Sequence, residues 1–117
     1  MCNCNIKMEI LEEKITTFGI KLSIVENEKE IGRCYIYIIK NDLHESPYAL
    51  LEDVYVDEKH RGKGIGTELV KRAIELAKNL GCYKIIATSR FERNNVHEWY
   101  EKLGFKKWGY EFRMDLK

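Results

Sequence analysis

The segment that most constrains the fold is a strand-like run that leads into a glycine-rich turn and then into a helix. Residues 48–56 begin with apolar residues on both faces, as a central strand does. Apolar residues from Leu69 to Leu80 recur every three or four positions, which predicts an amphipathic helix that Gly81 ends. Glycines at positions 62, 64 and 66 lie between them. This order is typical of phosphate sites, because first-turn N–H groups and the helix dipole point at the anion. A tight connection without a ligand is the alternative.

The remaining pattern predicts one α/β domain, 1–117, with a mixed sheet. Residues 8–15 suggest an edge strand or a hairpin arm, and residues 1–6 a flexible tail. The other expected elements are strands at 20–25 and 32–40 around a turn, a loop at 41–47, a buried strand at 82–89, a short helix at 94–104 capped by Asn94 or Asn95, and a closing strand at 108–116.

Composition excludes several classes of function. With 117 residues and a formal net charge of +1, the chain has no general electrostatic field for nucleic acid or an acidic membrane. No apolar run or leader predicts a membrane span or export, so we expect a cytoplasmic protein. Cys2 and Cys4 fall in the polar tail, and Cys34 and Cys82 are expected to be small buried residues. Their spacing does not match a metal site, so no metal is expected.

Two motifs resemble those of the GNAT superfamily of N-acetyltransferases. The run from Arg61 to Gly66, RGKGIG, is similar to its acyl-CoA pyrophosphate loop, and "HEWYEKLGF" (97–105) is similar to its tyrosine helix ending in Gly-Phe. The resemblance implies a mostly antiparallel sheet flanked by helices, with a V-shaped splay between the strands at 48–56 and 82–89. Residues 8–40 show no amphipathic helix, so the N-terminal helices of the family are expected to be reduced or missing.

The resemblance also implies a site for acetyl-CoA as cosubstrate. The pantetheine arm would lie in the splay, and a backbone N–H near residues 54–56 would hold the thioester carbonyl as an oxyanion hole does. Residues 62–67 would surround the pyrophosphate. The expected donor-binding residues are Val54, Val56, Arg61, Gly62, Lys63, Gly64, Ile65, Gly66, Thr67 and Arg93.

Acetyl transfer to an amine needs proton transfers that named residues could perform. Deprotonating a lysine-like amine at pH 7 costs about 4 kcal/mol, and releasing a cysteine-like thiolate costs about 2 kcal/mol. Tyr100 matches the family's general acid, with a core aromatic as the alternative. Glu52 is the candidate base, directly or through water, or else a solvated or ion-paired carboxylate. Strand alternation places Asp53 on the opposite face, and Thr88 stands where some relatives carry a glutamate base.

Two further runs of residues bear on the acceptor. The run that contains Arg93, His97 and Tyr100 is similar to one in small-molecule GNAT enzymes, such as aminoalkylphosphonate N-acetyltransferases, and "EDVYVDEKHRGKGIG" with "NLGCYKI" is similar to glucosamine-6-phosphate N-acetyltransferases. Arg90 or Arg93 would suit an anionic amine, although a CoA phosphate contact or a surface ion pair is the preferred interpretation of Arg93. His97 either orients the site or packs and caps the helix.

We therefore predict an acetyl-CoA-dependent N-acetyltransferase that acts on a small primary amine by direct attack in a ternary complex. An acyl-enzyme is disfavoured, because neither Cys34 nor Cys82 has a base beside it in sequence. The alternatives are a CoA-binding regulatory module, a peptide lysine acetyltransferase, and a structural domain. A homodimer that supplies the missing acceptor wall is a further expectation.

Overall fold

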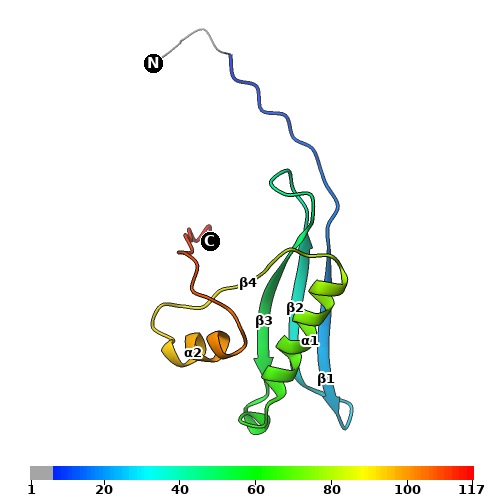
Figure 1. The fold of residues 1–117 in the computed structure, drawn as a ribbon, viewed down its shortest axis with the longest axis vertical. Coiled ribbons are helices and arrows are strands. Elements are labelled where there is room, and N and C mark those ends of the chain that lie inside the picture. Colours follow the sequence, from blue (N-terminus) through cyan, green and yellow to red (C-terminus); the bar gives the residue numbers. More distant parts are fainter. Residues whose placement is uncertain (1–6) are drawn as a thin grey trace.

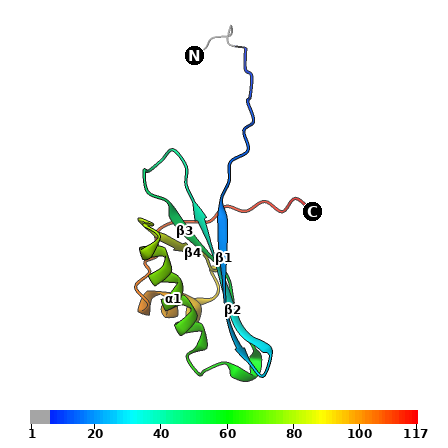
Figure 2. The ribbon, with the colours of Figure 1, turned by 90° about the vertical axis from the view of Figure 1, so that its right-hand side faces the viewer.

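The computed structural model describes residues 7–117, and its centre is a four-stranded sheet. Helix α1 lies across one face of this sheet, and α2 lies on the same side but beside the sheet, beyond β3 (Figures 1 and 2). The strands lie in the order β1-β2-β3-β4; β2 is antiparallel to both β1 and β3, and β4 runs parallel to β3. The predicted mixed, mostly antiparallel sheet is confirmed. In chain order the elements are β1 (Phe18–Glu26), β2 (Lys29–Ile39), β3 (Tyr48–Val56), a 3-10 turn (Glu58–His60), α1 (Ile65–Asn79), β4 (Ile85–Ala87) and α2 (Asn94–Lys102).

The β1–β2 hairpin forms where the sequence predicts it, around a two-residue turn. Asn27 and Glu28 have φ angles of 51° and 63°, so both central residues are left-handed. Two such residues are the pattern of a type I′ turn, whose twist matches that of the flanking strands. Asn tolerates this conformation, whereas Glu28 holds one that glycine would adopt without strain.

Helix α1 packs across β2 and β3 and closes the hydrophobic core. Gly32 allows this close approach, because a Cβ there would lie 2.8 Å from a methyl group of Ile65. The helix ends as predicted, with Gly81 in the left-handed conformation at φ 79°. The buried core residues are Leu69, Val70, Ala73 and Ala77 of α1 with Cys34, Ile36, Ile38, Ala49 and Leu51 of the strands.

Strands β3 and β4 pair over a short stretch and then part. Their register joins Ala49–Leu51 to Ile85–Ala87, after which β4 ends while β3 continues to Val56. Just beyond the last pair, β3 contains a bulge, where Asp53 and Val54 stand opposite Cys34 of β2. The sheet therefore opens at one end, as the resemblance to the family implies.

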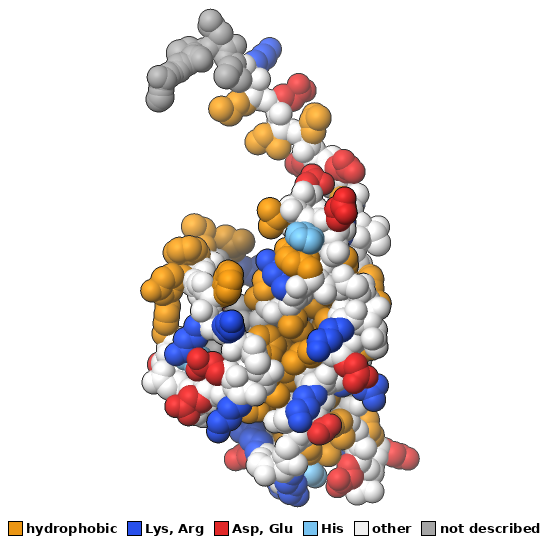
Figure 3. Space-filling model, in the orientation of Figure 1, with side chains coloured by type: hydrophobic (Ala, Val, Ile, Leu, Met, Phe, Trp, Pro, Cys, Tyr) orange, Lys and Arg blue, Asp and Glu red, His pale blue; other side chains and the backbone are white. Residues whose placement is uncertain are grey.

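Two predicted strands are wrong. Residues 8–15 form no strand, and Met8 and Ile10 are each 89% exposed. Residues 108–116 form none either; Trp108 and Phe112 are more than 90% exposed, and hydrophobic side chains of this segment are visible at the surface in Figure 3. Alternation shows which side chains could share a face, but a strand also needs a neighbour for its backbone hydrogen bonds.

Two boundaries also differ from the prediction. The strand expected at 82–89 is limited to Ile85–Ala87 and is half-buried, because its described pairing is with β3 alone. Helix α2 has Arg93 at its N-cap, without a side-chain cap, so Asn94 and Asn95 lie inside the first turn. The predicted tail, with Cys2 and Cys4, lies outside the described residues.

Candidate functional site

The glycine-rich turn presents its backbone openly at the start of α1. Gly62 and Gly64 have φ angles of 82° and 84°, and a Cβ built on either would meet no atom within 4 Å. Gly64 is the N-cap and offers no side chain to the first turn. The bond from Glu68 N–H to the Gly64 carbonyl, 3.0 Å, closes that turn. Residues 65–67 come before Glu68, so their N–H groups have no acceptor within the helix. These are the donors that a helix N-terminus can offer to an anion.

The two cations of the turn are placed differently. Arg61 donates from Nε to the Val56 carbonyl at 2.9 Å, which ties it to the end of β3, and its guanidinium lies 6.0 Å from the Tyr55 ring. Lys63 is exposed between the two left-handed glycines. The structure therefore places both predicted cations beside the open backbone, one anchored and one at the surface.

Trp99 of α2 joins the second half of the turn, a role that the sequence did not suggest. Its Nε1 donates to the Thr67 hydroxyl at 3.0 Å. Carbons of Trp99 and Val56 lie 3.5 Å from the position of a Cβ on Gly66. Gly66 and Thr67 therefore contact α2 and β3, whereas Gly62 and Gly64 remain open. The one available signal was the position of Trp99 beside Tyr100 in the second motif.

Tyr100 lies half-buried on the side of α2 that faces the core. Its ring centroid is 4.9 Å from that of Trp99 and 5.2 Å from that of Phe105. Burial raises the pKa of Tyr100; the charges of Cys34 and Glu52 raise the pKa further, and Arg93 lowers it. The phenol is therefore protonated at neutral pH, and strands β2 and β3 lie within electrostatic reach of it.

The bulge in β3 overturns one prediction from strand alternation. Glu52 pairs with Tyr35, and Asp53 bonds to the Arg33 side chain, 2.9 Å from Nε to Oδ2. Arg33 and Tyr35 are two positions apart on regular β2, so their side chains share the face opposite α1. Asp53 therefore does not point to the face opposite Glu52, because the extra residue of the bulge interrupts the alternation. Glu52 itself is exposed.

The segment between β4 and α2 is organised by His97. Its Nε2 lies 2.7 Å from the Arg90 carbonyl and donates to it. The N–H of Arg93 also donates to that carbonyl, at 3.1 Å, while Arg90 and Arg93 are themselves exposed. His97 thus holds the backbone of this segment. In the described part of the chain, the Ser89 hydroxyl is a buried side-chain oxygen without a hydrogen-bond partner, next to the exposed Thr88.

Neither described cysteine has the environment of a nucleophile. Cys34 is fully buried and its Sγ points to the Leu69 carbonyl at 3.9 Å; burial raises the pKa of this thiol to about 11. Cys82 is half-buried, less than expected, and burial raises its pKa as well. Because the thiolate is the reactive form, both environments disfavour an acyl-enzyme.

Comparison with known proteins identifies the family. Residues 5–105 match the model of the acetyltransferase (GNAT) family. A glucosamine 6-phosphate N-acetyltransferase of Trypanosoma brucei brucei is 39% identical over 66 residues, which cover 56% of this chain and 43% of that protein. An aminoglycoside N(6′)-acetyltransferase type 1 of Acinetobacter genomosp. 13 is 34% identical over 71 residues, 61% of this chain and 47% of that protein. The crystal structure of glucosamine-6-phosphate N-acetyltransferase from Arabidopsis thaliana has a TM-score of 0.76 at 28% identity, over 85% of this chain and 67% of that one.

The chain belongs to the GNAT family of acetyltransferases. Acetyl-CoA is the acyl donor of this family. The chain spans less than half the length of the two curated relatives named above. Within residues 7–117, no cluster of three or more His, Cys, Asp or Glu side chains is arranged to hold a metal ion, and no helix there is long and apolar enough to cross a membrane.

Proposed function

We propose that this chain carries the donor site of an acetyl-CoA-dependent N-acetyltransferase that acts on a primary amine of a small molecule, by direct attack in a ternary complex. The observation that carries the proposal is the open turn at Gly62 and Gly64, which follows the part of β3 that extends beyond its pairing with β4. Side chains do not fill this turn, so phosphate oxygens have access to its N–H groups.

The residues around the turn fit the donor. Arg61 and Lys63 would meet the phosphates, together with the N–H groups of residues 65–67, and Val54 and Val56 would flank the pantetheine arm at the parted strands. Arg93 would add a phosphate contact. Bound acetyl-CoA supplies the thioester whose acetyl group passes to the amine. An N–H among residues 54–56 would donate to the thioester carbonyl, a contribution that typically amounts to a few kcal/mol of barrier.

Tyr100 would assist the departing sulfur. Its raised pKa keeps the hydroxyl protonated, but transfer of that proton to a thiolate with a pKa near 8.5 is then uphill by about 2 kcal/mol or more. The main contribution of Tyr100 would therefore be a hydrogen bond that strengthens as charge develops on sulfur, with the proton delivered as the thiolate leaves.

Glu52 would take the proton from the amine. It is exposed at the end of the paired part of β3, and its charge acts on Tyr100, so acid and base would lie at the same opening. Exposure allows solvent to carry the proton away, and a water molecule can stand between Glu52 and the amine.

The acceptor class rests on the relatives and on an exposed cation. The relatives named above act, by their names, on glucosamine 6-phosphate and on aminoglycosides. Arg90 is exposed next to α2 and would suit an anionic small amine. Cytoplasmic localisation, a single domain and a homodimer remain predictions of the same proposal.

Two measurements test the proposal. Isothermal titration with CoA should give heat, which an Arg61→Met variant should reduce. Thiol release from acetyl-CoA should then appear with some members of a panel containing glucosamine 6-phosphate, an aminoglycoside and a lysine peptide. Absence of CoA binding at millimolar concentration would overturn the whole proposal, and activity with the peptide alone would overturn the small-molecule acceptor.

A CoA-binding module without turnover is the second candidate. The observation that favours it is that both described helices lie on one side of the sheet (Figure 2), so that the other face has no helix of residues 7–117 against it. Tyr37 and Tyr55 are more than a third exposed on that face. Binding of CoA without thiol release for any amine would favour this module over the enzyme.

A further inference from the structure

Asp53 holds an unusual backbone conformation within a strand. Its φ is 51°, in the left-handed region that residues with a Cβ rarely adopt, although Asp adopts it more readily than most. Among the described residues, the other non-glycine positions with positive φ are Asn27 and Glu28, both in the hairpin turn. Such a conformation persists only where surrounding contacts hold it, and it often occurs at functional sites.

This conformation lies at the bulge that redirects β3. Asp53 and Val54 together face Cys34, and the pairing of β3 with β4 ends two residues earlier, at Leu51. After the extra residue, Val54 packs toward the core, as Leu51 does. The direction in which the N–H groups of residues 54–56 point therefore depends on the backbone angles of Asp53, together with the pairing of Tyr55 and Val56 with β2.

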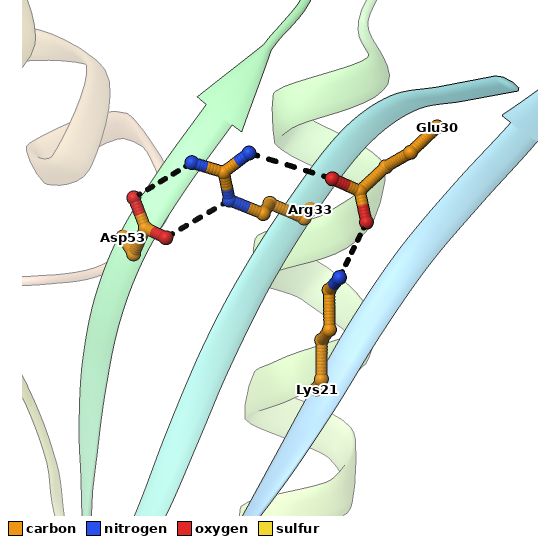
Figure 4. Close-up of polar contacts among 4 residues, drawn as sticks. All are labelled: Lys21, Glu30, Arg33 and Asp53. Atoms are coloured by element: carbon orange, nitrogen blue, oxygen red, sulfur yellow. Dashed lines mark hydrogen bonds and ion pairs between the residues drawn. The ribbon is translucent and has the colours of Figure 1, made fainter.

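Arg33 of β2 holds the Asp53 carboxylate through two parallel bonds (Figure 4). Nε donates to Oδ2 at 2.9 Å and Nη2 donates to Oδ1 at 3.3 Å. The remaining nitrogen, Nη1, donates to Glu30 at 3.4 Å, and Lys21 of β1 contacts the other oxygen of Glu30 at 2.6 Å. A planar two-point contact fixes the orientation of a carboxylate, which a single charge does not.

The same arginine is connected to the glycine-rich turn. Its guanidinium carbon lies 4.6 Å from the centre of the Tyr55 ring, and that of Arg61 lies 6.0 Å from the same ring. Arg61 in turn bonds to the Val56 carbonyl. Arg33 thus contacts two residues of the segment 53–56, Asp53 and Tyr55, and the Tyr55 ring also faces Arg61.

We propose that Arg33 is a positioning residue for the acyl-donor site, because its two-point contact keeps Asp53 left-handed and so fixes the direction of the N–H groups of residues 54–56. The inference rests on the proposed function, since these N–H groups matter to turnover only if a thioester carbonyl meets them. An exposed ion pair that merely stabilises the sheet is the alternative.

The test is whether glycine at position 53 makes Arg33 unnecessary. Arg33→Met keeps the length of the side chain but removes the fork, and kcat should fall about tenfold to a hundredfold with little change in KM, because losing an oxyanion donor outright costs about 10²–10³ in kcat. Glycine adopts positive φ freely. The double variant Arg33→Met/Asp53→Gly should therefore match Asp53→Gly alone in kcat within about threefold.

The matched control is Lys21→Met, which removes the Lys21–Glu30 contact from the same network but does not touch Asp53; its kcat should equal that of the wild type. A wild-type kcat in Arg33→Met would overturn the inference. So would a double variant as impaired as Arg33→Met. If Arg33→Met does not fold, Arg33→Lys, which keeps the charge without the fork, is held to the same expectations.

A second readout does not depend on turnover. Amide hydrogen exchange at residues 54–56, followed by NMR, should be faster in Arg33→Met than in the wild type. In the double variant the exchange rates should equal those of Asp53→Gly alone. Unchanged exchange in Arg33→Met would overturn the inference whatever the kinetics. If the wild type transfers no acetyl group, the proposed function fails, while the exchange data still decide whether Arg33 holds the bulge.

Discussion

Replacing Gly64 by Val separates the function of the glycine-rich turn from its contribution to stability. Gly64 is left-handed, at φ 84°, and a Cβ there meets no atom within 4 Å. The substitution therefore introduces backbone strain without a clash inside the protein. Gly81 offers a matched control at the other end of α1, with φ 79° and the same open space.

The expected magnitudes follow from these angles. A residue with a Cβ in the left-handed region costs about 1–2 kcal/mol, and more when it is β-branched. Domains of this kind have a free energy of unfolding of about 5–15 kcal/mol, so both variants should stay folded. Gly64→Val and Gly81→Val should thus lose similar stability. Only Gly64→Val places a side chain where phosphate oxygens would approach the first turn of α1, so it alone should lose CoA binding.

The test is urea unfolding and isothermal titration with CoA on the wild type, Gly64→Val and Gly81→Val. Gly81→Val should bind CoA as the wild type does. Gly64→Val should give no heat at about 1 mM CoA, which corresponds to binding weaker than about 4 kcal/mol. Wild-type affinity in Gly64→Val would refute the role of the turn, and equal loss of affinity in both variants would show that strain alone explains the effect.

Three further predictions concern the acid, the hairpin and acid stability. Tyr100→Phe should lower kcat about 10²–10⁴-fold in the thiol-release assay, and unchanged turnover at neutral pH would contradict the assignment. Glu28→Gly should raise the free energy of unfolding by about 1 kcal/mol, because it relieves a left-handed residue; a loss in urea unfolding would contradict the turn geometry. Hydrogen bonds from Arg33 lower the pKa of Asp53, and one from Lys21 lowers the pKa of Glu30. These carboxylates therefore stabilise the fold above their ordinary pKa near 4, and stability should fall as the pH decreases through their folded pKa values. In urea unfolding between pH 5 and pH 2, the free energy of unfolding should depend less on pH in Asp53→Asn than in the wild type. The same pH dependence in both proteins would contradict the stabilising role of the Asp53 carboxylate.

Local patterns predicted the parts of the site that lie close together in sequence. The glycines at 62 and 64 are the open left-handed positions, the helix that follows them packs its apolar stripe on the sheet, and Gly81 ends it. Each of these features depends on residues within a few positions of one another. Tyr100 was predicted from its motif, and its role remains a prediction.

The features that the sequence did not predict depend on partners far along the chain. Trp99 reaches Thr67 across 32 positions, and Arg33 reaches Asp53 across 20. The prediction for Asp53 from strand alternation was wrong because of the bulge. A single extra residue changes the face to which the following side chains point, and the composition of the strand does not reveal it. The segment 108–116 alternates well, yet it forms no strand.

The sequence by itself determined the order of strands and helices around the glycine-rich turn, since periodicity and the freedom of glycine are local properties of the chain. Only the tertiary structure decided where β3 leaves β4, which carboxylate the bulge turns toward Arg33, and which apolar segments obtain a partner. These outcomes depend on backbone hydrogen bonds and side-chain contacts between distant residues, and such pairings are settled by the packing of the whole sheet against α1.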